Sequence, residues 1–191
     1  MNKSILIDRF KSVIVGGLGL NINDPNLSGT PNRLTRMYEE LFQNVGKKPN
    51  KLIKTFPNPG FDEIIMLDNI PFTSMCSHHF LPFQGLAWFL YLPNAALLGA
   101  SKPARIIQFF SKKPQLQENL SREVMNYVVN EIKPRGAMLV MRAVHCCMSC
   151  RGANTGNQAG MTTSHTYGDF RDNPETRAEG LDLIKLSVSL R

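Results

Sequence analysis

The sequence has few of the residues that hold small secreted domains together. It contains only four cysteines among 191 residues, and Cys146, Cys147 and Cys150 fall within five positions. This crowding is a poor layout for disulfides, which stabilise most when they close long loops. A chain of this length with 42% hydrophobic residues can bury a core of its own. A disulfide-stapled peptide and a disordered chain are therefore both excluded.

Long apolar runs and targeting segments are also lacking. The longest apolar stretch, 85–100, is interrupted by Pro93 and Asn94 and is too short to cross a bilayer. The apolar segment 12–20 follows three charged side chains and precedes no small-residue cleavage site. We therefore expect a cytoplasmic protein without a membrane span, whose reduced cysteines bind a metal or pack.

Acidic residues are fewer than basic ones. The chain has 22 Lys and Arg against 15 Asp and Glu, which gives a net charge of +7 and a pI near 9.4. Such a surplus favours anionic partners, namely nucleotides, nucleic acid or an acidic membrane surface. The charge alone does not choose among them.

The apolar spacing predicts helices near the N-terminus. Leu6, Phe10 and Val13 share one helical stripe, and Thr30 followed by Pro31 is typical of a helix start. The apolar stripe predicted for this second helix consists of Leu34, Met37, Tyr38 and Leu41 and leaves Arg33 outside it.

Strands and helices then follow in blocks. Short apolar runs predict strands within 63–92 and from 137 to about 148. Two consecutive helices lie between them, one capped by Ser101 and the other over about 115–132. This order predicts an α+β fold, in which an antiparallel sheet carries two consecutive helices.

No repeat or composition shift divides the chain. We predict a single domain, 1–191, with an N-terminal helical part over 1–50 and a second part over 63–191. The tail is ambiguous, because Pro174 can start a helix whereas 184–190 alternates at period two. We expect a helix from about Pro174 and then a short strand.

Two segments carry residues that bind metals. Cys76 and His79 are three positions apart, and thiolate with imidazole suits zinc. With Cys147 and Cys150 they would form a closed, structural four-ligand site. Along a strand, however, His145 and Cys147 would share one face and Cys150 the other, which favours a three-ligand catalytic site. A bulge between the two cysteines would reverse this parity.

An open zinc site needs proton-transferring groups around it. A bound zinc lowers the pKa of water to about 7 and supplies a nucleophile at neutral pH. Charge that develops on the substrate then needs a proton donor, and histidine suits this work. His78 and His145 are both available for it.

Four stretches of the chain carry a resemblance to one enzyme family. They are TPNRLTRMYEEL, CSHHFLPFQG, GASKPARIIQFFSKKPQLQENL and VHCCMSCRG. Through these stretches, and in this order, the sequence resembles the GTP cyclohydrolase I family over about residues 28–177. The resemblance implies zinc ligands at Cys76, His79 and Cys147, and it does not require Cys150.

The same resemblance implies roles for other residues. His78 and His145 would transfer protons around the guanine ring, and Gln117 and Glu118 would bind the guanine. Ser101 would assist the later ribose steps together with His78. The residues implied for the triphosphate are Ser101, Lys102, Arg105, Arg151 and, from a neighbouring subunit, Arg33. A helix start with basic side chains is a reasonable phosphate site.

The resemblance also implies an assembly and a reaction. Its tunnelling-fold subunits join their antiparallel sheets into rings, and two pentameric rings stack into a decamer with active sites between subunits. Water activated at zinc attacks C8 of GTP, the imidazole ring opens, formate leaves, and the ribose rearranges and recloses to give 7,8-dihydroneopterin triphosphate. We expect GTP and further copies of the chain as partners, and neither nucleic acid nor a membrane.

Other interpretations stay open at this stage. A zinc-stabilised ring could bind nucleotides without turnover, and it would differ from the enzyme in whether zinc keeps a water. The reaction could also stop after deformylation, or it could serve deazaguanine rather than folate synthesis. The chain departs from the family pattern at Ser77, where an acid is usual, and this change is expected to alter the surroundings of the metal. The match is poor after Arg177.

Overall fold

A five-stranded sheet carries the fold, and its strands come from the segments where apolar residues alternate. The computed structural model describes residues 1–190. The strand order is β5-β2-β3-β6-β7, and every pair is antiparallel except the short β2–β5 contact. The strands are β2 (Ile65–Cys76), β3 (Pro82–Leu92), β5 (Pro114–Gln115), β6 (Gly136–His145) and β7 (Met161–Gly168). A separate pair, β1 (Thr55–Pro57) and β4 (Ala96–Leu98), lies in the connecting segments.

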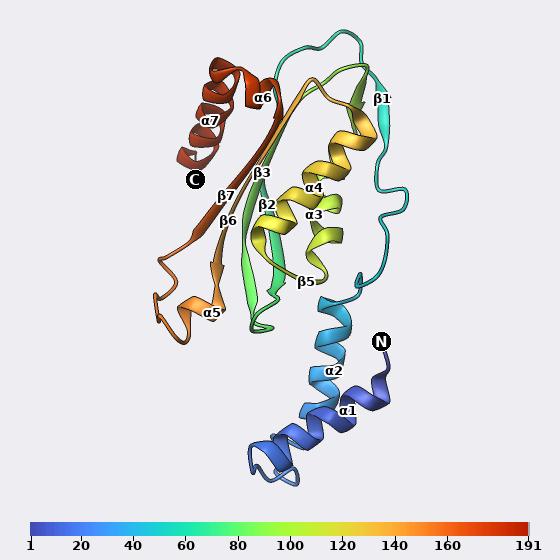
Figure 1. The fold of residues 1–191 in the computed structure, drawn as a ribbon, viewed down its shortest axis with the longest axis vertical. Helices are drawn as coiled ribbons and strands as arrows, with labels where there is room; N and C mark the ends of the chain where they lie inside the picture. The colour runs from blue at the N-terminus through green and yellow to red at the C-terminus, as the bar shows by residue number, and fades with distance from the viewer. Residues whose placement is uncertain (191) are drawn as a thin grey trace.

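The two helices between β3 and β6 cover one face of the sheet (Figure 1). They are α3 (Lys102–Ser111) and α4 (Gln117–Ile132), so the predicted α+β class with two consecutive helices is confirmed. Ser101 stands at the N-cap position of α3 as predicted, but its side chain makes no capping hydrogen bond. Alternate residues of β3 such as Phe89 and Tyr91 enter the core under these helices, because strand side chains point to opposite faces.

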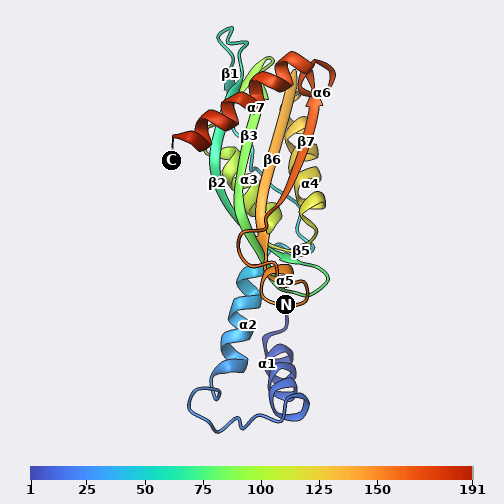
Figure 2. The ribbon, with the colours of Figure 1, turned by 90° about the vertical axis from the view of Figure 1, so that its left-hand side faces the viewer.

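The other face of the sheet packs against the C-terminal part of the chain (Figure 2). Trp88 and Leu90 of β3 form a smaller core there with Phe170 of α6 (Asp169–Asp172). The tail is one helix, α7 (Pro174–Ser189), so the predicted C-terminal strand is wrong. Leu183 and Ile184 pack on this core from helical positions, and that burial outweighs the period-two pattern.

The N-terminal helices extend beyond the end of the sheet (Figures 1 and 2). They are α1 (Lys3–Ser12), a π turn η1 (Val13–Gly17) and α2 (Thr30–Leu41), and we call them together the N-terminal hairpin. The predicted start of α2 is confirmed within a residue, since Gly29 stands at the N-cap and Pro31 in the first turn. The apolar stripe predicted to be buried on α2 is wrong in part, because Met37, one of its members, is 40% exposed.

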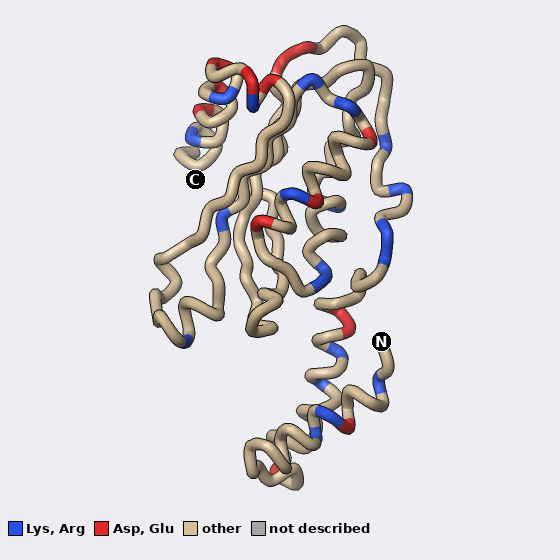
Figure 3. Tube along the Cα trace, in the orientation of Figure 1, with Lys and Arg blue, Asp and Glu red and all other residues tan. Residues whose placement is uncertain are grey.

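Charged residues are few in the sheet, where β2 carries Asp68 and β6 carries Arg142. Strands β3 and β7 contain no Lys, Arg, Asp or Glu, and charged residues lie mainly on helices and connecting segments (Figure 3). The residues that give the net charge of +7 are therefore spread along several elements of the chain. Within residues 1–190, no helix combines the length and the apolar character that crossing a bilayer requires.

Candidate metal centre and active site

Three metal-ligating side chains meet at the sheet end nearest the N-terminal hairpin. Cys76 is the last residue of β2, His79 lies in the turn after it, and Cys147 lies in the single-turn helix α5 (Cys146–Ser149). Their ligand atoms all lie within 4.8 Å of one another. The turn is held by hydrogen bonds from the Cys76 N–H to the Leu81 carbonyl and from the Phe80 N–H to the Cys76 carbonyl, both 2.9 Å.

Cys147 reaches this group from a helix and not from a strand. Strand β6 ends at His145, so the predicted strand to about Met148 is wrong and alternation along it cannot place Cys147. Cys150 is nevertheless outside the group, because its thiol is exposed and donates to the Cys146 carbonyl at 2.8 Å. The three-ligand set of the sequence prediction is thus brought together, by different local geometry.

The donor set and its spacing fit zinc. The Cys76 sulfur lies 3.9 Å from Nδ1 of His79, close to the roughly 3.6 Å expected between such ligands on tetrahedral zinc. Burial is the main cause that raises the pKa of the Cys147 thiol, and the adjacent Cys76 sulfur adds to it. A bound dication would reverse this, because a coordinating thiol is deprotonated. Three protein ligands leave a fourth tetrahedral position for water or substrate, as in catalytic zinc sites.

His145 lies beside the metal-ligand group at the end of β6. Its ring stacks on Phe83 with centroids 4.6 Å apart and planes 2° apart, and only 9% of the residue is exposed. Burial lowers the pKa of His145, and the negative charge of Glu118 partly offsets this effect. His78 is exposed in the turn beside His79, with ring centroids 6.1 Å apart.

Gln117 and Glu118 begin α4 next to this histidine. Glu118 is exposed in the first turn of the helix, where a ligand can reach it. The Gln117 side chain is fully buried, and its Oε1 lies 2.9 Å from Nε2 of His145. Its Nε2 faces three protein oxygens, so the predicted side-chain contact between Gln117 and guanine is not available in this arrangement.

The residues predicted for the triphosphate divide into one that lies near the candidate metal ligands and others that lie away from them. Arg151 follows α5 closely enough for its charge to lower the pKa of Cys147 against the larger raising effects. The carbonyl of Ser111, at the C-terminal end of α3, accepts a hydrogen bond from the Ser74 hydroxyl at 2.8 Å, and Ser74 lies two residues before Cys76. This end of α3 is therefore the one near the candidate metal ligands. Ser101 and Lys102 lie at its opposite end. A ten-residue helix is about 15 Å long. One chain therefore does not bring these two residues to the metal ligands.

Arg33 lies farther still, in the N-terminal hairpin. Its guanidinium donates to the Asn26 carbonyl at 2.8 Å and to the Thr30 hydroxyl at 2.9 Å. The start of α2 is the end of that helix away from the sheet (Figure 2). Within its own chain Arg33 thus caps a turn and does not meet the metal ligands.

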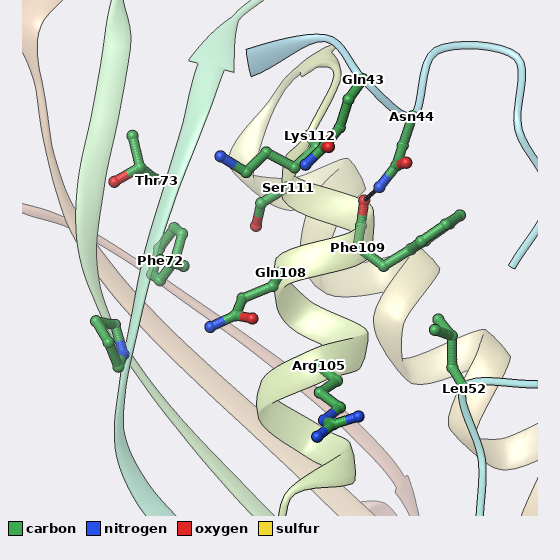
Figure 4. Close-up of a pocket in the computed structure, with 11 residues that line it drawn as sticks. Gln43, Asn44, Leu52, Phe72, Thr73, Arg105, Gln108, Phe109, Ser111 and Lys112 are labelled. Carbon is green, nitrogen blue, oxygen red and sulfur yellow. Dashed lines mark hydrogen bonds between the residues drawn. The ribbon is translucent and has the colours of Figure 1, made fainter. Parts of the chain in front are cut away.

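Arg105 faces a cleft between α3 and β2. The cleft has a volume of about 660 Å³, and Figure 4 shows Arg105, Gln108 and Lys112 along α3 opposite Phe72 and Thr73 of β2. Gln108 and Lys112 line the cleft but were not among the predicted site residues. The three-residue spacing of Gln108 from Arg105 places both on one face of α3 and could have indicated Gln108, whereas Lys112 follows the end of the helix.

The sheet has an open edge on each side. On its outer side β2 pairs only through Met75 and Cys76, with β5, and β7 pairs only with β6 in the described residues. Exposed edges of this kind are templates for pairing with another chain. The α3–β2 cleft lies along the first of these edges.

Comparison with known proteins assigns the family. A family model described as GTP cyclohydrolase I matches residues 7–185. The chain belongs to this family. The match extends on both sides of the 28–177 span found from motifs, so the tail is part of the family pattern.

Relatives named GTP cyclohydrolase 1 cover nearly the whole chain. The protein from Listeria welshimeri is 38% identical over 186 residues, which are 97% of each chain. That from Pelotomaculum thermopropionicum is 36% identical over 180 residues, 94% of this chain and 95% of its own. The protein from Acetivibrio thermocellus is 38% identical over 169 residues, which cover 88% of this chain and 90% of its own.

A solved structure described as the archaeosine synthase QueF-Like in the apo form is also similar. It is 13% identical, with a TM-score of 0.46, and the match covers 56% of this chain and 94% of that one.

Proposed function

We propose that this member of the GTP cyclohydrolase I family is a zinc enzyme that hydrolyses GTP to 7,8-dihydroneopterin triphosphate and formate. The observation that carries the proposal is the group of Cys76, His79 and Cys147, which excludes Cys150 and to which β6 leads through His145, two residues before Cys147. A closed four-ligand site in a nucleotide-binding module is disfavoured by the same observation. The free state of the cysteines fits the reducing cytoplasm predicted from the sequence.

Each residue at the metal end has a task that its chemistry allows. Cys76, His79 and Cys147 would hold zinc, which when bound acidifies water and so supplies a nucleophile near neutral pH. His145 and His78 would move protons to and from the purine, since imidazole titrates near neutrality. Buried His145 is held rigidly for this role, whereas exposed His78 can turn with the substrate.

Recognition of guanine is assigned to Glu118. A carboxylate accepts hydrogen bonds, and guanine presents N–H donors on its Watson–Crick edge. Glu118 is exposed in the first turn of α4 and interacts with His145, so it lies on the substrate side of the site.

The triphosphate needs cations that one chain does not bring to the metal. Arg151 is near the metal ligands, whereas Ser101, Lys102, Arg105 and Arg33 lie elsewhere on the same chain. We propose that a neighbouring copy supplies them, through pairing of the open β2 and β7 edges in a ring. The decamer of two stacked pentamers is the assembly that we propose for this ring.

The test is to load the purified protein with zinc, add GTP, and measure released formate and the absorbance of the pterin product. The proposal expects both products in equal amounts and neither from Cys147→Ser. Formate without the pterin would show a reaction that stops after deformylation. Binding of GTP without formate, at full zinc content, would contradict the enzymatic proposal and leave the nucleotide-binding module.

A further inference from the structure

The orientation of the buried Gln117 amide is fixed by its neighbours. Its Nε2 lies 3.0 Å from the Met141 carbonyl, 3.2 Å from the Met161 carbonyl and 3.1 Å from the Thr163 hydroxyl. Carbonyl oxygens only accept hydrogen bonds, so the atom that faces two of them must be the amide nitrogen. The flipped amide would set its oxygen against two carbonyl oxygens in a site with no exposed surface.

This orientation determines which nitrogen of His145 is occupied. The Gln117 oxygen can only accept, and it lies 2.9 Å from Nε2 of His145. That ring nitrogen therefore carries a hydrogen and donates it to Gln117. A half-turn of the ring would keep the stack on Phe83 but would set a ring carbon against the Gln117 oxygen, so the hydrogen bond fixes which edge faces Gln117. Nδ1 is the ring nitrogen left for anything outside this contact.

We propose that Gln117 is a positioning residue for His145, and that His145 exchanges protons with the substrate through Nδ1 alone. This inference rests on the proposed function and replaces guanine binding as the role of the Gln117 side chain. A histidine held through one nitrogen by a hydrogen bond keeps a single tautomer and a single ring orientation. The other nitrogen is then in place before the substrate arrives.

The same network joins the site to the edge of the sheet. Thr163 and Met161 belong to β7, the strand with an open edge, and Met141 belongs to β6. Gln117 thus connects α4, β6 and β7 through one side chain. Pairing of β7 with another chain would therefore act on the position of His145 through Thr163.

A spectroscopic experiment tests the contact without relying on turnover. The chain has only four histidines, so protein labelled with ¹⁵N-histidine gives few ring signals, and that of His145 is identified by its loss in His145→Asn. We expect a hydrogen on Nε2 that exchanges slowly with water in the wild type. In Gln117→Met this slow signal disappears. A hydrogen on Nδ1 in the wild type, or an unchanged slow Nε2 signal in Gln117→Met, would overturn the inference.

The matched control is Gln115→Met. Gln115 is also buried, and its Nε2 donates to the Phe110 carbonyl at 2.6 Å and lies 3.2 Å from the Ser74 hydroxyl. The substitution removes comparable hydrogen bonds without touching His145, so the slow signal must persist. Its loss in the control as well would assign the effect to general loosening and refute a specific contact.

Kinetics separates positioning from guanine binding. We expect Gln117→Met to lower kcat by about 10²-fold, within the usual range for acid–base groups, and to change KM for GTP by less than about threefold. A raised KM with unchanged kcat would instead show that Gln117 binds the substrate.

A second variant covers the case in which Gln117→Met fails to fold. Nδ1-methylhistidine at position 145 leaves Gln117 intact and blocks Nδ1, and in its neutral form it carries no hydrogen on Nε2. Formate release should then fall by about 10²-fold or more, and the slow Nε2 signal should be lost. Full activity would refute the role of Nδ1. If the wild type releases no formate, the proposed function fails, and the Nε2 signal still decides the Gln117 contact.

Discussion

The metal end of the sheet and the N-terminal hairpin differ in how completely one chain builds them. At the metal end, His145 and Gln117 are buried and hydrogen-bonded, and three ligands already converge. The hairpin leaves Val13 and Leu18 more than half exposed, and its Arg33 meets only its own turn. Folding of one chain thus brings the candidate metal ligands together, whereas it leaves the residues proposed for the triphosphate apart, and the proposed assembly would have to join them.

The largest effect is expected where the metal end is broken. Cys147→Ser should abolish zinc binding and activity together, because it removes one of three ligands. Cys150→Ser should retain both, since its thiol is exposed and bonded only to a backbone carbonyl. Zinc content by atomic absorption and formate release measure the two variants. Equal zinc loss in both would instead establish a structural site of three cysteines and one histidine.

Removal of His145 should stop the reaction without emptying the metal site. His145→Ala is expected to lower kcat by about 10²- to 10⁴-fold, the range for a lost acid–base group. Zinc content should stay at the wild-type level, because His145 is not among the three grouped ligands. The measurement is kcat for formate release, on protein whose zinc content has been determined. An unchanged kcat would show that His145 takes no part in the mechanism.

Stability measurements compare the sheet core directly with the hairpin. Phe89 is 1% exposed under α3 and α4, so Phe89→Ala should cost about 3–5 kcal/mol. Phe10 is half-buried and meets Tyr38 at 5.4 Å, so Phe10→Ala should cost only about 1 kcal/mol. Urea unfolding at one fixed protein concentration gives both values. A larger loss for Phe10→Ala would show that association buries the hairpin.

Mixed oligomers test whether the hairpin completes a neighbouring site. Arg33→Ala and Cys147→Ser subunits are each expected to be nearly inactive alone. Co-refolded together, they should recover up to about a quarter of the wild-type activity per subunit, because a fraction of the interfaces combines two intact halves. Formate release before and after mixing is compared, with mass spectrometry to verify mixing. No recovery in verified mixtures would place Arg33 outside a shared site.

The smallest expected effect is a pH dependence from β7. Burial, together with the charges of Arg171 and Arg122, lowers the pKa of His165. The unfolded chain keeps a pKa of about 6.5, so below that pH it binds a proton that the folded chain does not. Stability should therefore fall as the pH drops from about 7.5 towards the folded pKa. Urea unfolding at two pH values should show a smaller fall in His165→Gln, and an equal fall would exclude this contribution.

Much of the fold could be predicted because it depends on local pattern. The helices α3 and α4 and the strands β2, β3 and β6 lie near their predicted positions, since their periodicity and their burial agree. The helix predicted from about Pro174 is confirmed, but the strand predicted after it, within 184–190, is wrong, because a short alternating run also fits a helix that packs one side on a core. The end of β6 was missed for a similar reason, as no residue type announces a single helical turn at Cys146.

The candidate site likewise has features that local sequence predicts and features that it does not. The grouping of the three candidate metal ligands could be predicted from their spacing and from the resemblance, although Cys147 lies on a helix and not on the predicted strand. The contacts of Gln117 were not predictable, because its partners Met141, Met161 and Thr163 are far away in the sequence and two of them contribute backbone atoms. Backbone partners leave no trace in residue identity.

The sequence by itself determined the class of the fold, the family and the chemical types at the metal centre, because these depend on periodicity and on which side chains are present. Tertiary structure alone decided that Cys147 reaches the group from a helical turn, that Gln117 contacts His145, and that Ser101 and Lys102 lie away from the candidate metal ligands. The physical reason is that distances and hydrogen-bond directions between segments are set by packing, and packing is not written in any single stretch of the chain.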